Sequence, residues 1–241
     1  MLSRFITVAP RHTWEIIGAS SIAIHYPEKG KDGIMSKEKP ILFKDEMIRA
    51  ILEGRKTQTR RIARNVHFDS KYRAKWKAVR KHTEVSIDTP AAMLGDVCPY
   101  GQPGDQLWVR EKFATHFIWD DLPPGHIDIQ NHSDGFFYAD GTITNPGCED
   151  HQRGKWRPSI HMPRFASRIT LEITDVRVER LQDISAEDAK AEGVEPFHLN
   201  GWCDDQKFRG EFFNLWMEIN GPDSWDANPW VWVIEFKQVT P

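Results

Sequence analysis

The clearest hydrophobic pattern of the chain is an alternation of apolar and polar residues over residues 167–180. Apolar residues occupy positions 169, 171 and 173, and then 176 and 178. Successive side chains of a strand point to opposite faces, so this alternation predicts a long, half-buried strand. The period slips by one residue near Asp175, which predicts a β-bulge or bend there.

Shorter patterns predict the other elements. Apolar or alternating runs indicate further strands at 40–43, 106–111 and 230–236. Helical spacing and helix end signals predict helices at 44–53, 186–192 and 211–219. Ser185 is an N-cap with Asp188 three residues on, and Gly54 and Gly193 end the first two helices. Strands and helices are mixed without regular βαβ units, so we expect an α+β fold with a largely antiparallel sheet.

Two segments show little periodicity. Residues 64–95 are basic and rich in Lys, and we expect helix and loop there. Residues 114–155 are rich in Asp, Gly, Pro and His. A long irregular segment inside a domain is usually a functional loop or mobile.

Charge is unevenly distributed along the 241 residues, although the net charge is only −3. Residues 44–81 hold 13 Lys and Arg against 4 Asp and Glu, a net charge of +9. Residues 182–235 hold 3 against 12, a net charge of −9. The basic segment indicates a polyanionic partner, most commonly nucleic acid, or else a solvated helix with alternating charge.

The three cysteines, Cys98, Cys148 and Cys203, form no CxxC pair. An odd count at wide spacing argues against a disulfide framework and is typical of a reducing cytoplasm. Cys148 to His151 has ligand-like spacing, but without a second pair it indicates a structural zinc only weakly, and we expect no metal. No apolar stretch is long enough to span a membrane.

Residues 1–34 differ from the rest of the chain. The apolar run at 16–24 is short, and His25 to Pro27 follows it where a signal peptide would have small residues. Met35 opens a polar segment typical of a translation start. We therefore expect 1–34 to be a disordered or dispensable N-terminal extension and 35–241 to be a single domain.

Candidate chemistry is concentrated in residues 54–61, Gly-Arg-Lys-Thr-Gln-Thr-Arg-Arg. Lys56 and Thr59, three residues apart, would share one face of a helical turn or tight loop. Neighbouring cations lower the pKa of a lysine, and a partly neutral lysine beside a hydroxyl is a plausible base and nucleophile pair. The arginines, Arg60 and Arg61 among them, could instead hold a phosphate. The segment alone leaves both interpretations open.

The order of these landmarks resembles the ASCH domain of the PUA-like superfamily. The family signature is GxKxxExR, and Thr59 stands where the pattern has glutamate. The same threonine marks the bacterial N4-acetylcytidine amidohydrolase branch, which also has a glutamate in the helix after the long strand, as Glu192 is here. The matching motifs are Gly54-x-Lys56-x-x-Thr59-x-Arg61, Gly104-Asp105-x-Leu107-x-Val109, the strand at 167–180, the Ser185 helix and Val233-Ile234-Glu235-Phe236-Lys237.

The resemblance implies a small mixed or antiparallel PUA-like β-barrel with flanking helices and long insertions near 64–95 and 114–160. It implies that Lys56 acts as base, Thr59 as nucleophile and Glu192 as the group that assists proton transfer to the leaving amine, with no cofactor. Arg61 would stabilise the oxyanion or bind ligand, as Arg60 would.

Residues 156–163, Trp-Arg-Pro-Ser-Ile-His-Met-Pro, are similar to a motif of longer phage and prophage ASCH proteins. Arg157 and His161 in it are candidate substrate-binding residues, and a structural role for His161 is equally open. The resemblance implies RNA or a modified nucleoside or nucleotide as partner. Three functions follow from it: amide hydrolysis of an N-acylated cytidine, RNA or nucleotide binding without chemistry, and ribonuclease activity.

Overall fold

The computed structural model describes residues 36–69, 75–88, 91–127, 135–144, 147–196 and 203–239. All of them belong to one compact unit, Ser36–Pro241. The expectation for residues 1–34 lies outside the described residues.

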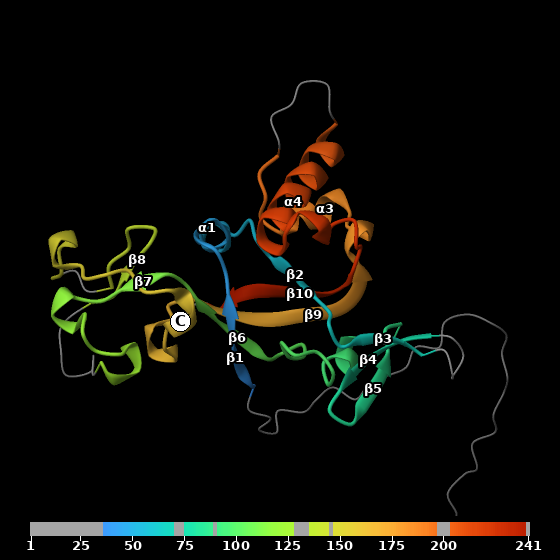
Figure 1. The fold of residues 1–241 in the computed structure, drawn as a ribbon, viewed down its shortest axis with the longest axis horizontal. Helices are drawn as coiled ribbons and strands as arrows, with labels where there is room; N and C mark the ends of the chain where they lie inside the picture. The colour runs from blue at the N-terminus through green and yellow to red at the C-terminus, as the bar shows by residue number, and fades with distance from the viewer. Residues whose placement is uncertain are drawn as a thin grey trace, which may run out of the picture. The chain divides into compact units, whose positions relative to one another are not determined.

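A five-stranded sheet forms the centre of this unit (Figure 1). Neighbouring strands are antiparallel, except that the first pair is parallel. The α+β prediction is confirmed, and within the described residues the two edge strands are not hydrogen-bonded to each other, so the sheet is open. In spatial order the strands are β1 (Glu38–Leu42), β6 (Gln106–Arg110), β9 (Thr170–Arg180), β10 (Trp230–Val239) and β2 (Gln58–Ile62).

The predicted bulge in β9 is confirmed. Asp175 pairs with Glu235 and Ile173 pairs with Phe236, so Thr174 is the extra residue. The shift keeps Val176 on the same face as Ile173, in the main hydrophobic core. Beyond the bulge, Arg177 consequently lies on the opposite face of the sheet.

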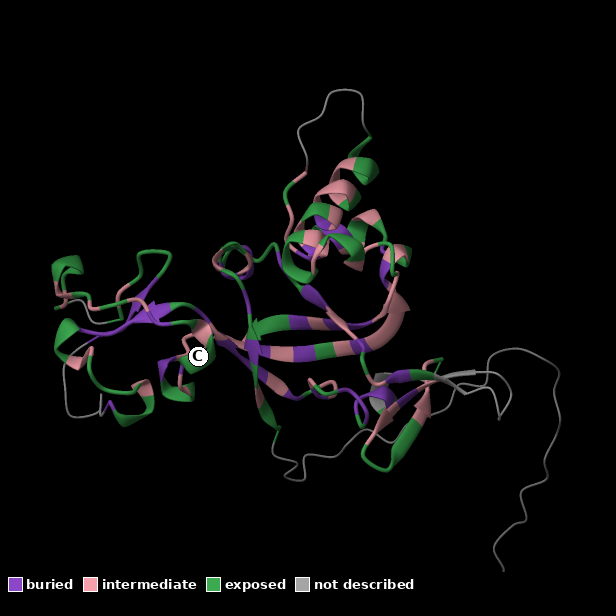
Figure 2. Ribbon diagram, viewed as in Figure 1, coloured by how far each residue is buried: buried purple, intermediate pink, exposed green. Residues whose placement is uncertain are grey.

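Residues 231–234 of strand β10 are all buried, so this part of the strand is covered on both faces, as its continuous apolar sequence predicts (Figure 2). Trp232, Ile234 and Phe236 belong to the main core, and Val231 and Val233 to a second core. Three helices that contribute to these cores are α1 (Asp45–Leu52), α3 (Ala186–Ala191) and α4 (Asp204–Asn220). All three overlap the predicted helices.

The prediction of helix and loop for residues 64–95 is largely wrong. A three-stranded antiparallel sheet occupies most of the segment, with β3 (Val66–Asp69), β4 (Lys75–Arg80) and β5 (Thr83–Ser86), followed by the short helix α2 (Ala91–Leu94). Lys81, with φ of 54°, begins the tight turn between β4 and β5. From this small sheet, Val66 and Ala78 pack into the main core. Because so few of its apolar residues are buried in that core, the alternation of apolar and polar residues that would predict its strands is weak.

The described residues between 113 and 166 form mostly turns around a small core, as their lack of periodicity predicts. The core consists of Phe113, Phe136, Tyr138, Met162 and Ala166. Strands β7 (Phe113–Ala114) and β8 (Phe137–Tyr138) pair within it. Short 3₁₀ helices here and elsewhere are Phe117–Trp119, Pro124–His126, Asp150–Gln152, Ser159–His161, Arg164–Ala166, Leu181–Asp183 and Pro222–Ser224.

None of the described helices has the length and apolar character needed to cross a membrane. Cys98, Cys148 and Cys203 are not joined by disulfides.

Candidate active site

The end of α1 fixes the position of Lys56. The chain turns at Gly54, whose φ is +74°, and the backbone amides of Arg55 and Lys56 both donate to the Ala50 carbonyl, at 2.8 and 2.9 Å. Strand β2 then begins at Gln58. The expectation that Lys56 and Thr59 share a helical turn is therefore wrong, because the residues that follow Lys56 are extended.

Lys56 forms a buried ion pair with Glu192, the residue that ends α3. Its Nζ donates to Glu192 Oε2 at 2.7 Å and to the Glu192 carbonyl at 2.8 Å. The two side chains are 0% and 3% exposed. Burial lowers the pKa of Lys56 from its ordinary value, and Arg61 and Arg60 lower it further, although Glu192 opposes the shift. At a given pH the neutral form of this lysine is therefore more populated than that of a lysine in water, and only the neutral form can accept a proton.

Helix α3 holds Glu192 against Lys56 through a tight backbone contact. Ser185 Oγ accepts from the Asp188 amide at 3.0 Å, which caps the start of the helix as predicted. At the other end Gly193 has φ of +85°, and a Cβ there would lie 2.7 Å from Lys56 Cβ and 2.9 Å from Ala50 Cβ. Only glycine fits this position without displacing the ion pair.

Arg60 extends the ion pair into a network. Its Nη1 lies 3.3 Å from Glu192 Oε1, and its Nη2 lies 3.0 Å from Asp188 Oδ2 and 3.1 Å from Glu179 Oε2. Arg177 adds a contact to Asp188 at 3.1 Å. Burial alone would raise the pKa of Asp188, but the arginines and a hydrogen bond from Gln58 outweigh it and lower that pKa. Each buried charge thus has a partner, which buried ions require.

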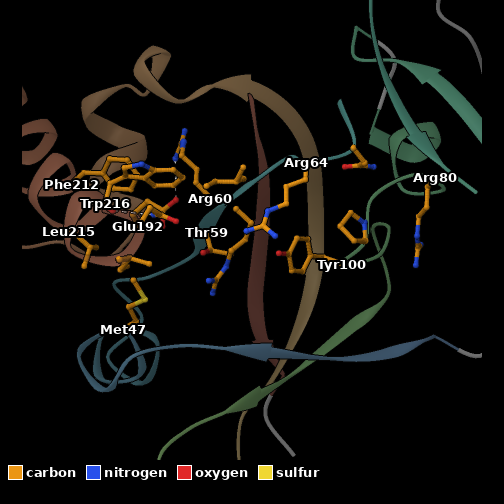
Figure 3. A pocket seen from close by; sticks show the side chains of 16 residues that line it. Met47, Thr59, Arg60, Arg64, Arg80, Tyr100, Glu192, Phe212, Leu215 and Trp216 are labelled. Carbon is orange, nitrogen blue, oxygen red and sulfur yellow. Dashed lines mark hydrogen bonds and ion pairs between the residues drawn. The ribbon is translucent and has the colours of Figure 1, made fainter. Parts of the chain in front are cut away.

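Strand β2 borders a cavity of about 460 Å³, and its residues 59–62 all line it (Figure 3). Thr59 and Glu192 both line it, and the Thr59 hydroxyl has no hydrogen-bond partner among the described residues. Lys56 lies behind this wall: its Nζ is 5.6 Å from the Phe43 ring centroid, and Arg61 Cζ is 5.3 Å from the same centroid. The lysine therefore adjoins the strand face that carries Thr59 and Arg61, although no hydrogen bond joins it to Thr59.

Aromatic and cationic side chains complete the wall. Phe212 and Trp216 of α4 lie beside Glu192 at one end, and Tyr100 lies toward the other end (Figure 3). The remaining lining residues are Met47, Arg60, Arg61, Ile62, Arg64, Asn65, Arg80, Pro99, Leu215, Ile219 and Asn220. Aromatic side chains therefore line the cavity at both ends.

The structure does not bring Arg157 and His161 to this cavity. Arg157 is buried in the turn-rich segment, where its Nη2 donates to the Trp119 carbonyl at 2.7 Å. His161 is exposed at the end of a 3₁₀ helix. His151 pairs with Glu149 at 3.1 Å, and no group of three potential metal ligands occurs among the described residues.

Several contributors to the site were missed from the sequence, among them Gln58, Asp188, Arg64, Arg80 and Tyr100. The sequence did hold a signal for Gln58, because every second residue of an extended chain lies on the same face, so residues 56, 58 and 60 share one face. In the structure Lys56, Gln58 and Arg60 all contact α3 or the residue that caps it. The others depend on contacts distant in sequence.

No protein-family model, curated protein or solved structure matches this chain. The site is therefore defined by its own geometry: a buried Lys56–Glu192 pair, a Thr59 hydroxyl with no partner in the part of the chain that the structure describes, and a cavity that Thr59 and Glu192 both line.

Proposed function

We propose that this chain is an ASCH-like amidohydrolase that removes the acyl group from an N-acylated cytidine, with Lys56, Thr59 and Glu192 as its catalytic residues. The observation that supports the proposal best is the buried Lys56–Glu192 pair, 2.7 Å apart, behind the wall on which Thr59 stands. A desolvated lysine, an adjacent carboxylate and an unpartnered hydroxyl are the parts of a nucleophile–base system.

In the first step, neutral Lys56 accepts the Thr59 hydroxyl proton as Thr59 Oγ attacks the acyl carbonyl. Substrate binding must bring the lysine and the hydroxyl into contact, since catalytic hydrogen bonds often tighten only in the complex. When the C–N bond breaks, the proton passes from Lys56 through Glu192 to the departing exocyclic amine. Cytidine leaves, and the acyl group remains on Thr59 as an ester.

In the second step, water attacks the ester carbonyl, and the released threonine oxygen recovers a proton. Glu192 and Lys56 relay that proton, so the reaction consumes one water and yields cytidine and a carboxylic acid. Glu192 also lines a second cavity of about 350 Å³, which offers a further route for water. Arg61, beside Thr59 on the strand, is the candidate cation for the oxyanion in both steps.

The PUA-like fold belongs to the same proposal. Arg61 Nη2 of edge strand β2 donates to the carbonyl of Leu42, the last residue of edge strand β1, at 2.5 Å. A sheet curled until its two edges approach each other supports a barrel-like arrangement of the kind found in that superfamily.

RNA or nucleotide binding without chemistry is the second candidate. The contacts that Lys56 and Arg60 already make with carboxylates favour it. Lys56 already donates to two oxygens of Glu192, and Arg60 already contacts three carboxylates. A site of this kind could hold a base against Phe212 and Trp216 with no group left to move protons.

The first test is whether the purified chain converts N4-acetylcytidine to cytidine, followed by chromatography. Lys56→Met and Glu192→Gln should each lower kcat by about 10²–10⁴-fold, the usual contribution of a general acid or base. The matched controls are Lys44→Met and Glu218→Gln, because Lys44 and Glu218 form an equally short but exposed pair, also 2.7 Å apart. These controls should keep wild-type activity.

The outcomes separate the three functions. Binding of N4-acetylcytidine without cytidine release would favour the binding module. Cleavage of RNA without deacylation would favour the ribonuclease. Activity that survives both Lys56→Met and Glu192→Gln would show that the catalytic residues are assigned wrongly.

A further inference from the structure

The cavity has two chemically different ends. Glu192, Phe212 and Trp216 lie at one end, and Arg64, Arg80 and Tyr100 toward the other (Figure 3). Among the described residues that line the cavity, Glu192 is the only carboxylate, and it is already paired with Lys56 and Arg60. Within that set, the Tyr100 end is therefore cationic without an acidic neighbour.

Three arginines contribute that charge. Arg64 is exposed and has no hydrogen bond or ion pair within the described residues. Arg80 Nη1 donates only to the Cys98 carbonyl, at 3.3 Å. Arg61 donates to the Leu42 carbonyl, and its Nε is buried without a partner among the described residues. None of the three forms an ion pair in the part of the chain that the structure describes.

Unpaired arginines that face a cavity are suited to phosphate. The guanidinium fork matches phosphate oxygens and binds them through charge-assisted hydrogen bonds, often two at a time. A cleft lined by one sign of charge also raises the local concentration of the opposite ion. The volume of about 460 Å³ lies within the usual range for small-molecule ligands, about 300–1,000 Å³.

We propose that Arg64 and Arg80 form a phosphate subsite, and that the substrate is a nucleotide whose phosphate binds there while its acylated base lies beside Thr59 and Glu192, where Arg61 is the candidate cation for the oxyanion. The assignment of the base end rests on the proposed amidohydrolase function. The phosphate end rests on the charge distribution alone.

The subsite also gives residues 64–95 a role. Arg64 precedes β3 and Arg80 ends β4, so the small sheet β3–β5 delivers two of the three arginines to the cavity wall. Arg61 comes from β2 of the central sheet. A segment that would be an insertion in a minimal ASCH-like domain thereby extends the pocket and selects for a phosphorylated ligand.

The test compares kcat/KM for N4-acetylcytidine and its 5′-monophosphate. In the wild-type chain the monophosphate should be preferred by about tenfold or more, the effect expected of charge-assisted hydrogen bonds. The double variant Arg64→Gln/Arg80→Gln should remove this preference, so that kcat/KM for the monophosphate falls to the value that the same variant shows for the nucleoside. Equal kcat/KM for both substrates in wild type, or a preference that survives the double variant, would overturn the subsite.

The control Lys81→Gln/Arg209→Gln removes two positive charges outside the cavity lining. It should keep the preference. An oligonucleotide that contains N4-acetylcytidine distinguishes the source of the phosphate: a preference for it over the monophosphate, lost in the Arg64/Arg80 double variant, assigns the subsite to a phosphodiester of RNA.

Binding of cytidine 5′-monophosphate by titration calorimetry separates this proposal from the amidohydrolase proposal. If no acylated compound is hydrolysed but the monophosphate binds, more weakly at high salt and not in the double variant, the subsite holds and the chemistry fails. If the monophosphate and cytidine bind equally, the subsite fails whatever the chemistry.

Discussion

At the scale of single residues, the proposed function depends most on Lys56. Two opposing effects act on its ammonium group: burial favours the neutral form, and Glu192 at 2.7 Å favours the charged form. Burial wins, with help from Arg60 and Arg61, so the pKa of Lys56 is lowered from 10.5. Strongly perturbed groups beside a cavity are typical of functional sites.

This shift predicts a pH dependence of stability. Between the folded pKa of Lys56 and 10.5, the unfolded state binds one more proton than the folded state, so the free energy of unfolding rises with pH across that window. Below the pKa of Lys56 in the folded state, the free energy of unfolding is reduced by the full cost of charging the buried lysine. Urea unfolding at several pH values should show wild type gaining stability relative to Lys56→Met as pH rises toward 10.5. A difference that is flat or falls would contradict the shifted pKa.

At the scale of elements, α3 and the start of β2 make the site together. The Ser185 cap fixes where α3 begins, and Gly193 lets it end against Lys56. The bulge at Thr174 places Arg177 toward α3, where it contacts Asp188. Local backbone features thus determine which charges meet beneath the cavity.

Replacing Gly193 with alanine tests that packing. Gly193→Ala and Gly104→Ala carry the same left-handed strain, about 1–2 kcal/mol, because their φ values are +85° and +90°. A Cβ at Gly104 meets nothing within 4 Å, whereas one at Gly193 meets Lys56 Cβ at 2.7 Å. Urea unfolding and deacylation assays should show that Gly193→Ala loses more stability and also loses activity. Equal losses in the two variants would show that the contact does not matter.

The elements with strong local signals were predictable from the sequence. The slip of period near Asp175, the Ser185 cap and the apolar run in β10 each left a pattern of their own. The sheet at 64–95 did not, because its strands are short and bury few apolar residues. The pairing of Lys56 with Glu192 spans 136 residues, and only the resemblance to the ASCH domain linked the two before the structure did.

At the scale of the whole molecule, the oppositely charged segments of the sequence are partners. Lys56 and Arg60 from the basic segment contact Glu192 and Asp188 from the acidic one. What remains of the basic segment after this pairing includes Arg61, Arg64 and Arg80 at the cavity. The cavity is therefore locally cationic, although the net charge of the chain is −3.

A shortened chain tests the domain prediction. The ion-pair network and the cavity lie within the unit Ser36–Pro241, so a chain that begins at Met35 should fold and keep its activity. Circular dichroism melts should give the same midpoint for the full and shortened chains, and deacylation rates should match. A lower midpoint or lost activity would show that residues 1–34 contribute to the domain.

The most direct test of the central claim is the rate at which Thr59→Ala releases cytidine from N4-acetylcytidine, relative to wild type. Removing one buried hydroxyl from an edge strand leaves the Lys56–Glu192 pair and the cavity in place, so the comparison isolates the nucleophile. The account predicts measurable release by wild type and none above background by Thr59→Ala. Release at the wild-type rate by the variant, or no release by either protein, would contradict it.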